Sequence, residues 1–120
     1  MTDRKMTLAD VLAAQHELQV AMGHPTGHGH VAVKENVLAA IVELTEVLGE
    51  VPWKPWKKYD PRQDDQIDRI ALLTEMTDVL QFWANMVNAM GFTAEDVALA
   101  LATKWNENYR RTNNGETTQA

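Results

Sequence analysis

Two nearly apolar stretches of the chain, residues 37–52 and 70–92, carry carboxylates as their only formal charges. These carboxylates are Glu43, Glu46, Glu50, Glu75 and Asp78. Residues three apart on an α-helix project from one face, so Glu43 would lie beside Glu46, and Glu75 beside Asp78. Neither stretch contains a Lys or Arg that would neutralise these groups in a helical ion pair. Because burying an unpaired carboxylate is costly, the pattern indicates a cation supplied from outside the chain.

Hard oxygen ligands on two facing helices suit Mg²⁺ or Mn²⁺, which prefer carboxylates, waters and substrate phosphates. We therefore predict that Glu43, Glu46, Glu75 and Asp78 bind Mg²⁺, with Mn²⁺ as a substitute. Glu50 is either an outer ligand or the solvated end of its helix. A di-iron bundle would use Glu-x-x-His pairs, which the sequence lacks because all four histidines lie at or before position 30.

The elements that must position these groups read as helices. Apolar periodicity and capping signals predict helices over residues 8–22, 31–49, 63–91 and 93–111, with no strand-like alternation. Thr7 with Asp10, and Thr93 with Asp96, are expected N-terminal capping pairs. We expect an all-α fold, a four- to five-helix bundle formed by a single domain over residues 1–111, followed by a polar, mobile tail over 112–120.

The helices over 31–49 and 63–91 are apolar around most of their circumference, which is typical of central or interface helices. We therefore expect a homodimer formed through these helices, with a tetramer as the alternative. A formal charge of −6 argues against a nucleic-acid or anionic membrane surface. The absence of cysteine excludes disulfides, and the lack of a signal core or charge-free apolar span predicts a cytoplasmic protein.

Three blocks in this order resemble the all-α nucleoside triphosphate pyrophosphatases of the MazG-like superfamily, and most closely the dimeric, all-helical dUTPases. The first two blocks are the Glu43–Glu46 and Glu75–Asp78 pairs, which flank a Trp53-Lys-Pro-Trp56-Lys57 element. The third block is the set Lys104, Asn108, Arg111 and Gly115. A weaker match is the Gln-x-x-Leu segment that begins at Gln15. One departure is Gln81, where close relatives have histidine.

The resemblance implies hydrolysis of a deoxynucleoside triphosphate, most closely dUTP, between the α and β phosphates. Glu46 is then the candidate that orients or deprotonates the attacking water. The expected phosphate-binding residues are Lys54, Lys57, Lys104, Asn108 and Arg111. A solvated helix end, with cations favouring the C-terminal dipole, is the alternative for the last three.

Base recognition is expected from residues that stack or present an amide. These residues are Trp53, Trp56, Gln15 and Asn85. The tryptophan rings on their proline-bounded loop either stack on a base or cap the end of the bundle as core. An amide offers a donor and an acceptor to the edge of a pyrimidine, although a single helical glutamine is also a common surface residue.

Alternatives remain open at this point. The first is a MazG-like housecleaning pyrophosphatase that acts on dCTP, a purine dNTP or a modified nucleotide. The second is a helical interaction module without enzymatic activity. His24, His28 and His30 would form a zinc site only if their glycine-rich loop ordered around the ion, and a mobile or substrate-covering loop is favoured.

Overall fold

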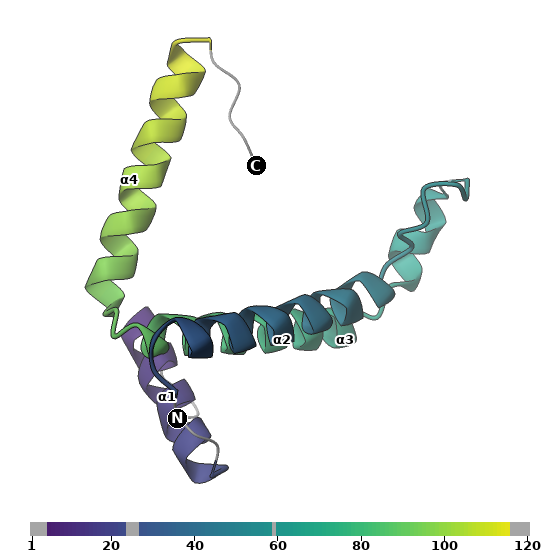
Figure 1. Ribbon diagram of the computed structural model, residues 1–120. Coiled ribbons are helices and arrows are strands. Elements are labelled where there is room, and N and C mark those ends of the chain that lie inside the picture. Colours follow the sequence, from purple (N-terminus) through teal and green to yellow (C-terminus); the bar gives the residue numbers. More distant parts are fainter. Residues whose placement is uncertain (1–4, 24–26, 59, 116–120) are drawn as a thin grey trace.

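The computed structural model describes residues 5–23, 27–58 and 60–115. In these residues the elements are α1 (Leu8–Ala21), α2 (Gly29–Gly49), the 3₁₀ helix η1 (Pro61–Gln66), α3 (Arg69–Ala89) and α4 (Ala94–Asn113), with no strand (Figure 1). The expected all-α class is therefore confirmed.

Local signals in the sequence set several helix ends. The Thr7 hydroxyl accepts from the Asp10 backbone N–H at 3.1 Å, and the Asp10 carboxylate accepts from the Thr7 N–H at 2.9 Å. Thr93 and Asp96 form the same reciprocal pair at the start of α4. Both predicted capping boxes are thus confirmed. After α3, Gly91 adopts a φ of 71°, the left-handed conformation in which glycine ends helices at no steric cost.

The prediction of one helix over residues 63–91 is wrong at its start. Residues 61–66 form the separate helix η1, whose N-terminus is capped by the Asp60 side chain. The chain is extended at Ile67, and the Asp68 carboxylate then accepts from the Ala71 N–H at 3.0 Å to begin α3. A second capping residue therefore starts a new helix, and the polar run 61–66 has no buried residue to hold it against the bundle.

Two further boundaries differ from the expectation. Helix α2 begins at Gly29, inside the stretch that was assigned to the glycine-histidine loop, and residues 24–26 of that loop lie outside the described residues. Helix α4 continues to Asn113, two residues into the expected tail, and residues 116–120 also lie outside the description. Arg110 and Arg111 in the last turn of α4 favour this extension because cations stabilise a helix C-terminus.

The helices α2 and α3 form a long hairpin, and α1 packs across the end where α2 begins and α3 ends (Figure 1). The buried core lies at this crossing and consists of Leu12, Ala84 and Val87, with Leu8, Trp83, Ala94 and Val97 packed around them. The Asn88 side chain ties α3 to α1 by donating to the Leu12 carbonyl at 3.0 Å. The backbone of α4 approaches only α1, and α4 then diverges from the α2–α3 hairpin (Figure 1).

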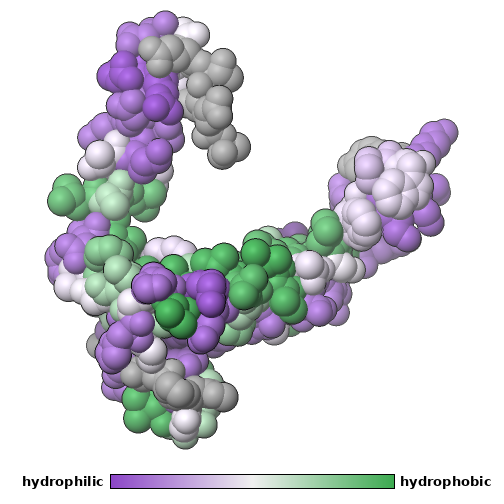
Figure 2. Space-filling view, viewed as in Figure 1, coloured by the Kyte–Doolittle hydropathy of each residue, from purple (hydrophilic) through white to green (hydrophobic). Residues whose placement is uncertain are grey.

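The protomer is open and exposes much apolar surface. Its radius of gyration is 17.7 Å, whereas a compact chain of this length has about 13.5 Å. Large apolar side chains lie exposed along α2 and α3, and Figure 2 shows them gathered on the visible side of α2. Among the described helices, none is long and apolar enough to cross a membrane.

Candidate metal and nucleotide site

Three carboxylates from two helices meet in the middle of the α2–α3 hairpin. Glu43 comes from α2, and Glu75 and Asp78 come from α3. One oxygen from each lies within 4.8 Å of the other two, and all three residues are half-buried. The antiparallel hairpin therefore brings together three of the four predicted metal ligands.

The spacing and the charge of this cluster fit Mg²⁺. Oxygen ligands lie 2.0–2.1 Å from Mg²⁺, so two oxygens on opposite sides of the ion are about 4.2 Å apart. Only one pair of three ligands can be opposite, and adjacent oxygens around the ion are about 3 Å apart, so these oxygens, which lie within 4.8 Å of one another, must draw together by side-chain rotation to hold one ion. No lysine or arginine in the described ranges forms an ion pair with any of these carboxylates. The cluster thus offers a hard, negatively charged oxygen set of the kind that Mg²⁺ or Mn²⁺ takes.

Glu75 lies at the electrostatic centre of this cluster. Partial burial raises the pKa of its carboxyl above the ordinary value of 4.5, and the negative charges of Asp78, Glu43, Glu46 and Glu50 raise the pKa further. Loss of solvent and like charges both disfavour the ionised form. No positive charge is among the causes of this shift, in agreement with the lack of an ion pair to this carboxylate in the described residues.

Glu46 is placed differently from the other predicted ligands. Its side chain is exposed and does not belong to the three-residue oxygen set, although its charge acts on Glu75. It lies one turn beyond Glu43 on α2, toward the loop with the tryptophans. Glu46 is therefore adjacent to the cluster and open to water, and Glu50 lies one further turn along α2.

A second feature is a pocket of about 600 Å³ where α1 crosses the α2–α3 hairpin. Its polar lining includes Gln15 from α1 and Asn85 from α3, so the structure brings together two residues that were predicted to read a base. Gln15 is only 7% exposed, and its amide has no hydrogen-bond partner in the described part of the chain. Because no fully buried side-chain nitrogen or oxygen in the described residues lacks a partner, the Gln15 amide keeps some contact with solvent and is free to bond a ligand in the pocket.

Asn36 and Phe82 are among the lining residues of this pocket that sequence reasoning missed. The Asn36 carbonyl oxygen accepts from the Asn85 amide at 3.1 Å, which joins α2 to α3. Phe82 is one of the apolar residues of α3, and it lines the pocket, where it offers an apolar surface to a ligand. One signal was available for Asn36, because it precedes Glu43 by seven residues and therefore shares its helix face.

The pocket and the carboxylate cluster lie along one face of the hairpin. Asn36 and Glu43 are seven residues apart on α2, and Asp78 and Asn85 are seven apart on α3. In each helix this separation is two turns, about 10.5 Å along one face. The linked asparagines and the clustered carboxylates are therefore two neighbouring subsites, at a separation that the sugar and α-phosphate of a nucleotide can bridge.

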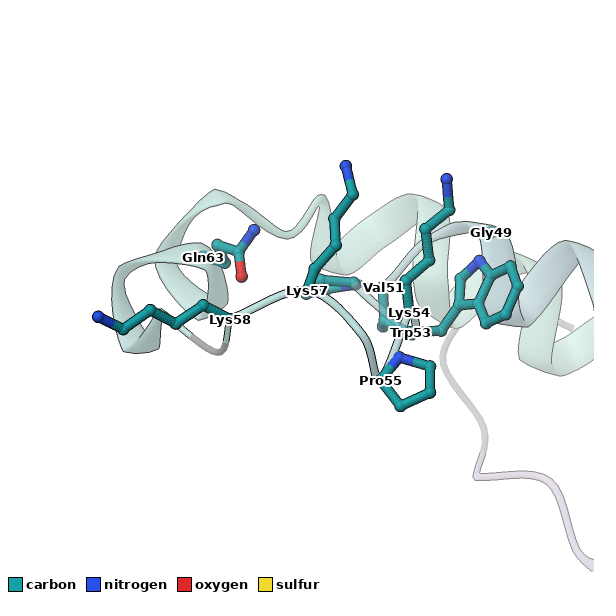
Figure 3. A pocket seen from close by; sticks show the side chains of 9 residues that line it. Gly49, Val51, Trp53, Lys54, Pro55, Lys57, Lys58 and Gln63 are labelled. Atoms are coloured by element: carbon teal, nitrogen blue, oxygen red, sulfur yellow. The ribbon is translucent and has the colours of Figure 1, made fainter.

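The loop after α2 holds the predicted tryptophans and lysines away from the base pocket. Trp53 and Trp56 pack edge to face, with ring centroids 5.7 Å apart, and are 45% and 70% exposed. Trp53, Lys54 and Lys57 line a shallow pocket of about 470 Å³, which Trp56 does not line. Lys54 and Lys57 extend from the same side of the loop (Figure 3). The structure thus groups the two tryptophans and two lysines after the C-terminus of α2, beyond the carboxylate cluster.

The predicted phosphate residues on α4 do not meet the carboxylates within one protomer. Lys104, Asn108 and Arg111 lie on the part of α4 that diverges from the hairpin (Figure 1). Lys104 lines an apolar groove of about 720 Å³ between α1, α3 and α4. Arg111 forms an ion pair with Glu107 at 3.3 Å on its own helix. A phosphate role for this trio requires α4 of another copy or a movement of α4.

Comparison with known proteins gives one family. A family model described as dUTPase matches residues 1–114, which is nearly the whole chain. No curated protein and no solved structure gives a significant match.

Proposed function

Because the chain belongs to the all-helical dUTPase family, we propose that it is a Mg²⁺-dependent hydrolase that converts dUTP to dUMP and pyrophosphate. The bond that breaks joins the α-phosphorus to the oxygen that leads to the β-phosphate. Water supplies the new oxygen on the α-phosphorus, and pyrophosphate leaves with the bridging oxygen. The meeting of Glu43, Glu75 and Asp78 from two helices is the observation that carries this proposal.

These three carboxylates would hold Mg²⁺, because they offer clustered oxygens without a neutralising cation. Bound there, Mg²⁺ would bind phosphate oxygens and lower the pKa of the attacking water. Glu46 then orients that water and accepts its proton. Its exposed position next to the cluster supports this role, since a general base must contact the attacking water and cannot be held in the set of metal ligands.

The base occupies the pocket lined by Gln15, Phe82 and Asn85. The pocket volume of about 600 Å³ lies within the usual range of small-molecule sites. The two-turn separation from Asn85 to Asp78 lets the sugar and α-phosphate extend along this face of the hairpin toward the carboxylates. The tryptophan loop lies beyond the carboxylates, so Lys54 and Lys57 serve the β- and γ-phosphates, and Trp53 and Trp56 cover that end from water.

A homodimer is part of this proposal. The accessible surface is 9531 Å², whereas a folded monomer of this mass exposes about 6500 Å². The excess is about 3000 Å² for each protomer, or about 6000 Å² for two, which matches the largest interfaces that obligate homodimers bury. Leu38, Ile41 and Val42 are apolar residues of α2 that are each more than half exposed. A second copy that covers α2 and α3 would remove this surface from water.

The second copy also completes the site in this proposal. Within one protomer, α4 holds Lys104, Asn108 and Arg111 away from the carboxylates. Apolar residues on the same helix, among them Leu101 at 44% and Trp105 at 57%, are exposed and available for packing against another copy. We therefore place α4 of one protomer against the hairpin of its partner, where its cations contact the triphosphate.

The first test is a panel of dUTP, dTTP, dCTP, dATP and dGTP with Mg²⁺, in which pyrophosphate and orthophosphate are measured separately. We expect pyrophosphate from dUTP at the highest kcat/KM and no hydrolysis when the metal is chelated. Glu46→Gln is the matched variant, because it keeps the size of the side chain and removes the base. Hydrolysis of none of the nucleotides would contradict the proposal.

The same panel separates the two alternatives. A housecleaning pyrophosphatase would release pyrophosphate from dCTP, a purine nucleotide or a modified nucleotide faster than from dUTP. An interaction module would show no turnover and no change on Glu46→Gln. Gln81 lines the base pocket and stands where close relatives have histidine. Base preference is therefore the property in which this chain is most expected to differ from them, and the panel measures it directly.

A further inference from the structure

The two asparagines of the base pocket form a relay with a defined direction. The Asn36 Nδ2 group donates to the Ala32 carbonyl at 2.8 Å, and the Asn36 Oδ1 atom accepts from Asn85 Nδ2 at 3.1 Å. We infer that Asn36 is a positioning residue that fixes the direction of the Asn85 amide and thereby selects uracil or thymine over cytosine. This inference rests on the proposed nucleotide site and goes beyond it, because it assigns the choice of base to a residue that need not touch the base.

The direction of the relay follows from the chemistry of a carbonyl group. The Ala32 carbonyl can only accept a hydrogen bond, so Asn36 must turn its Nδ2 group toward it and its Oδ1 atom toward Asn85. The Asn36 Oδ1 atom can likewise only accept, so Asn85 must present Nδ2 to it. The orientation of both amides is therefore set by a backbone group of α2, which cannot reverse its polarity.

The relay leaves the Asn85 oxygen for the ligand. Among the described residues no donor bonds this Oδ1 atom, and no buried side-chain nitrogen or oxygen lacks a partner. The Oδ1 atom must therefore reach solvent, and the pocket is where Asn85 is open. Gln15 stands in the same pocket with an unpartnered amide, which can bond a base carbonyl. The pocket thus offers a fixed acceptor and an adaptable amide.

A fixed acceptor distinguishes the two kinds of pyrimidine. Uracil and thymine carry a donor at N3, which the Asn85 oxygen can accept. Cytosine carries a lone pair at N3, so when its N3 takes the same place against the Asn85 oxygen, two acceptors face each other and both lose a hydrogen bond; its 4-amino donor lies one position along the edge. Leaving such buried groups unsatisfied lowers affinity by about 10- to 100-fold. The relay does not act on the C5 methyl group, so it does not separate uracil from thymine.

The experiment compares wild type, Asn36→Asp and Asn36→Leu. Aspartate at this position loses the donor to the Ala32 carbonyl but keeps an acceptor for Asn85 Nδ2 in either orientation, whereas leucine has a similar size and removes both. For each protein, kcat and KM are measured with dUTP and dCTP, and dissociation constants with dUMP and dCMP. Circular dichroism melts report folding, and Asn36→Ala serves as a second variant without the acceptor if Asn36→Leu does not fold.

We expect wild type and Asn36→Asp to prefer the uracil nucleotides by at least about tenfold in KM and in the dissociation constant. In Asn36→Leu the Asn85 amide is free to turn, so this ratio should approach one while kcat for dUTP changes little. A purely structural role for Asn36 would instead lower kcat and affinity for both nucleotides alike.

Equal ratios in Asn36→Asp and Asn36→Leu would overturn the relay, and so would a wild type that binds dCMP as tightly as dUMP. In either case Mg²⁺-dependent hydrolysis of dUTP would still support the proposed function. Selective binding of dUMP that is lost in Asn36→Leu, without hydrolysis of any triphosphate, would support the relay and overturn the proposed function. Binding of neither monophosphate would overturn the relay.

Discussion

Replacing Ile41 by glutamate is expected to dissociate the proposed homodimer without unfolding the protomer. Ile41 lies between Leu38 and Val42 on the exposed side of α2. Ile41 is 52% exposed, Leu38 57% and Val42 58%. In a monomer, glutamate at this position would therefore be solvated. In the dimer the same side chain would be buried among apolar residues of the partner.

The exposed fraction of Ile41 sets the size of the effect. Full burial of a side chain of this size contributes about 1.5–3 kcal/mol, so burying the exposed half of Ile41 contributes about 1 kcal/mol. A twofold dimer contains the position twice. Burying a carboxyl group without a partner costs at least about 1–3 kcal/mol more at each position. The sum, about 4 kcal/mol or more, weakens dimerisation by about 1000-fold.

The assay is sedimentation velocity over the micromolar concentration range, with circular dichroism to confirm unchanged helix content. Ala102→Glu is the matched control, because Ala102 is exposed and shares one face of α4 with Glu95 and Asn106. The control should stay dimeric and active. Ile41→Glu should be monomeric and should lose hydrolysis of dUTP, since α4 of a partner no longer reaches the carboxylates.

Two outcomes would refute this reasoning. An Ile41→Glu protein that remains a dimer would show that this side of α2 is not the interface. A monomeric Ile41→Glu protein with wild-type kcat and KM would show that one protomer holds a complete site, and that α4 contributes nothing in trans.

Further predictions concern the carboxylates and α4. Glu46→Gln and Arg111→Ala should each lower kcat/KM by at least about 100-fold. An equal mixture of the two inactive proteins should recover up to about a quarter of wild-type activity, because half of the dimers are mixed and each mixed dimer holds one unaltered site. No recovery of activity would place both residues in the site of one protomer. Glu75→Gln should raise the melting temperature of the metal-free protein at pH 7, because it removes a carboxylate whose pKa is raised by partial burial and by Asp78 and Glu43. That advantage should shrink as the pH falls toward 4.5, since the folded wild type takes up this proton before the unfolded chain does; an advantage that grows in acid would contradict the assignment. Mg²⁺ should stabilise wild type more than Glu75→Gln, which thermal melts with and without the ion will measure.

Local chemistry made part of this protein predictable from its residues. Thr7 with Asp10, and Thr93 with Asp96, cap helices by bonds between neighbours three apart, so no distant contact is needed. The acidic pairs were visible for the same reason, because three-residue spacing puts side chains on one face of any helix. The all-α class and the family blocks are likewise properties of order and spacing along the chain.

Boundaries and partners across helices were less predictable. The start of α3 was misplaced because the polar residues 61–66 suit a helix N-terminus as well as the separate turn of η1, and the cap at Asp68 decided between them. Asn36 was missed because its importance lies in a bond to Asn85, 49 residues away. A periodic pattern shows which face a residue occupies but not which residue of another helix lies opposite it.

By itself, the sequence determined the helices, the acidic pairs and the family, since each depends on residues close together in the chain. The tertiary structure decided that Glu43 meets Glu75 and Asp78, that Asn36 meets Asn85, and that α4 turns away. The physical reason is register, because the packing of α2 against α3 sets which side chains share a groove. The packing within one chain leaves apolar side chains of α2 and α3 exposed, and in the proposed homodimer a second copy covers them.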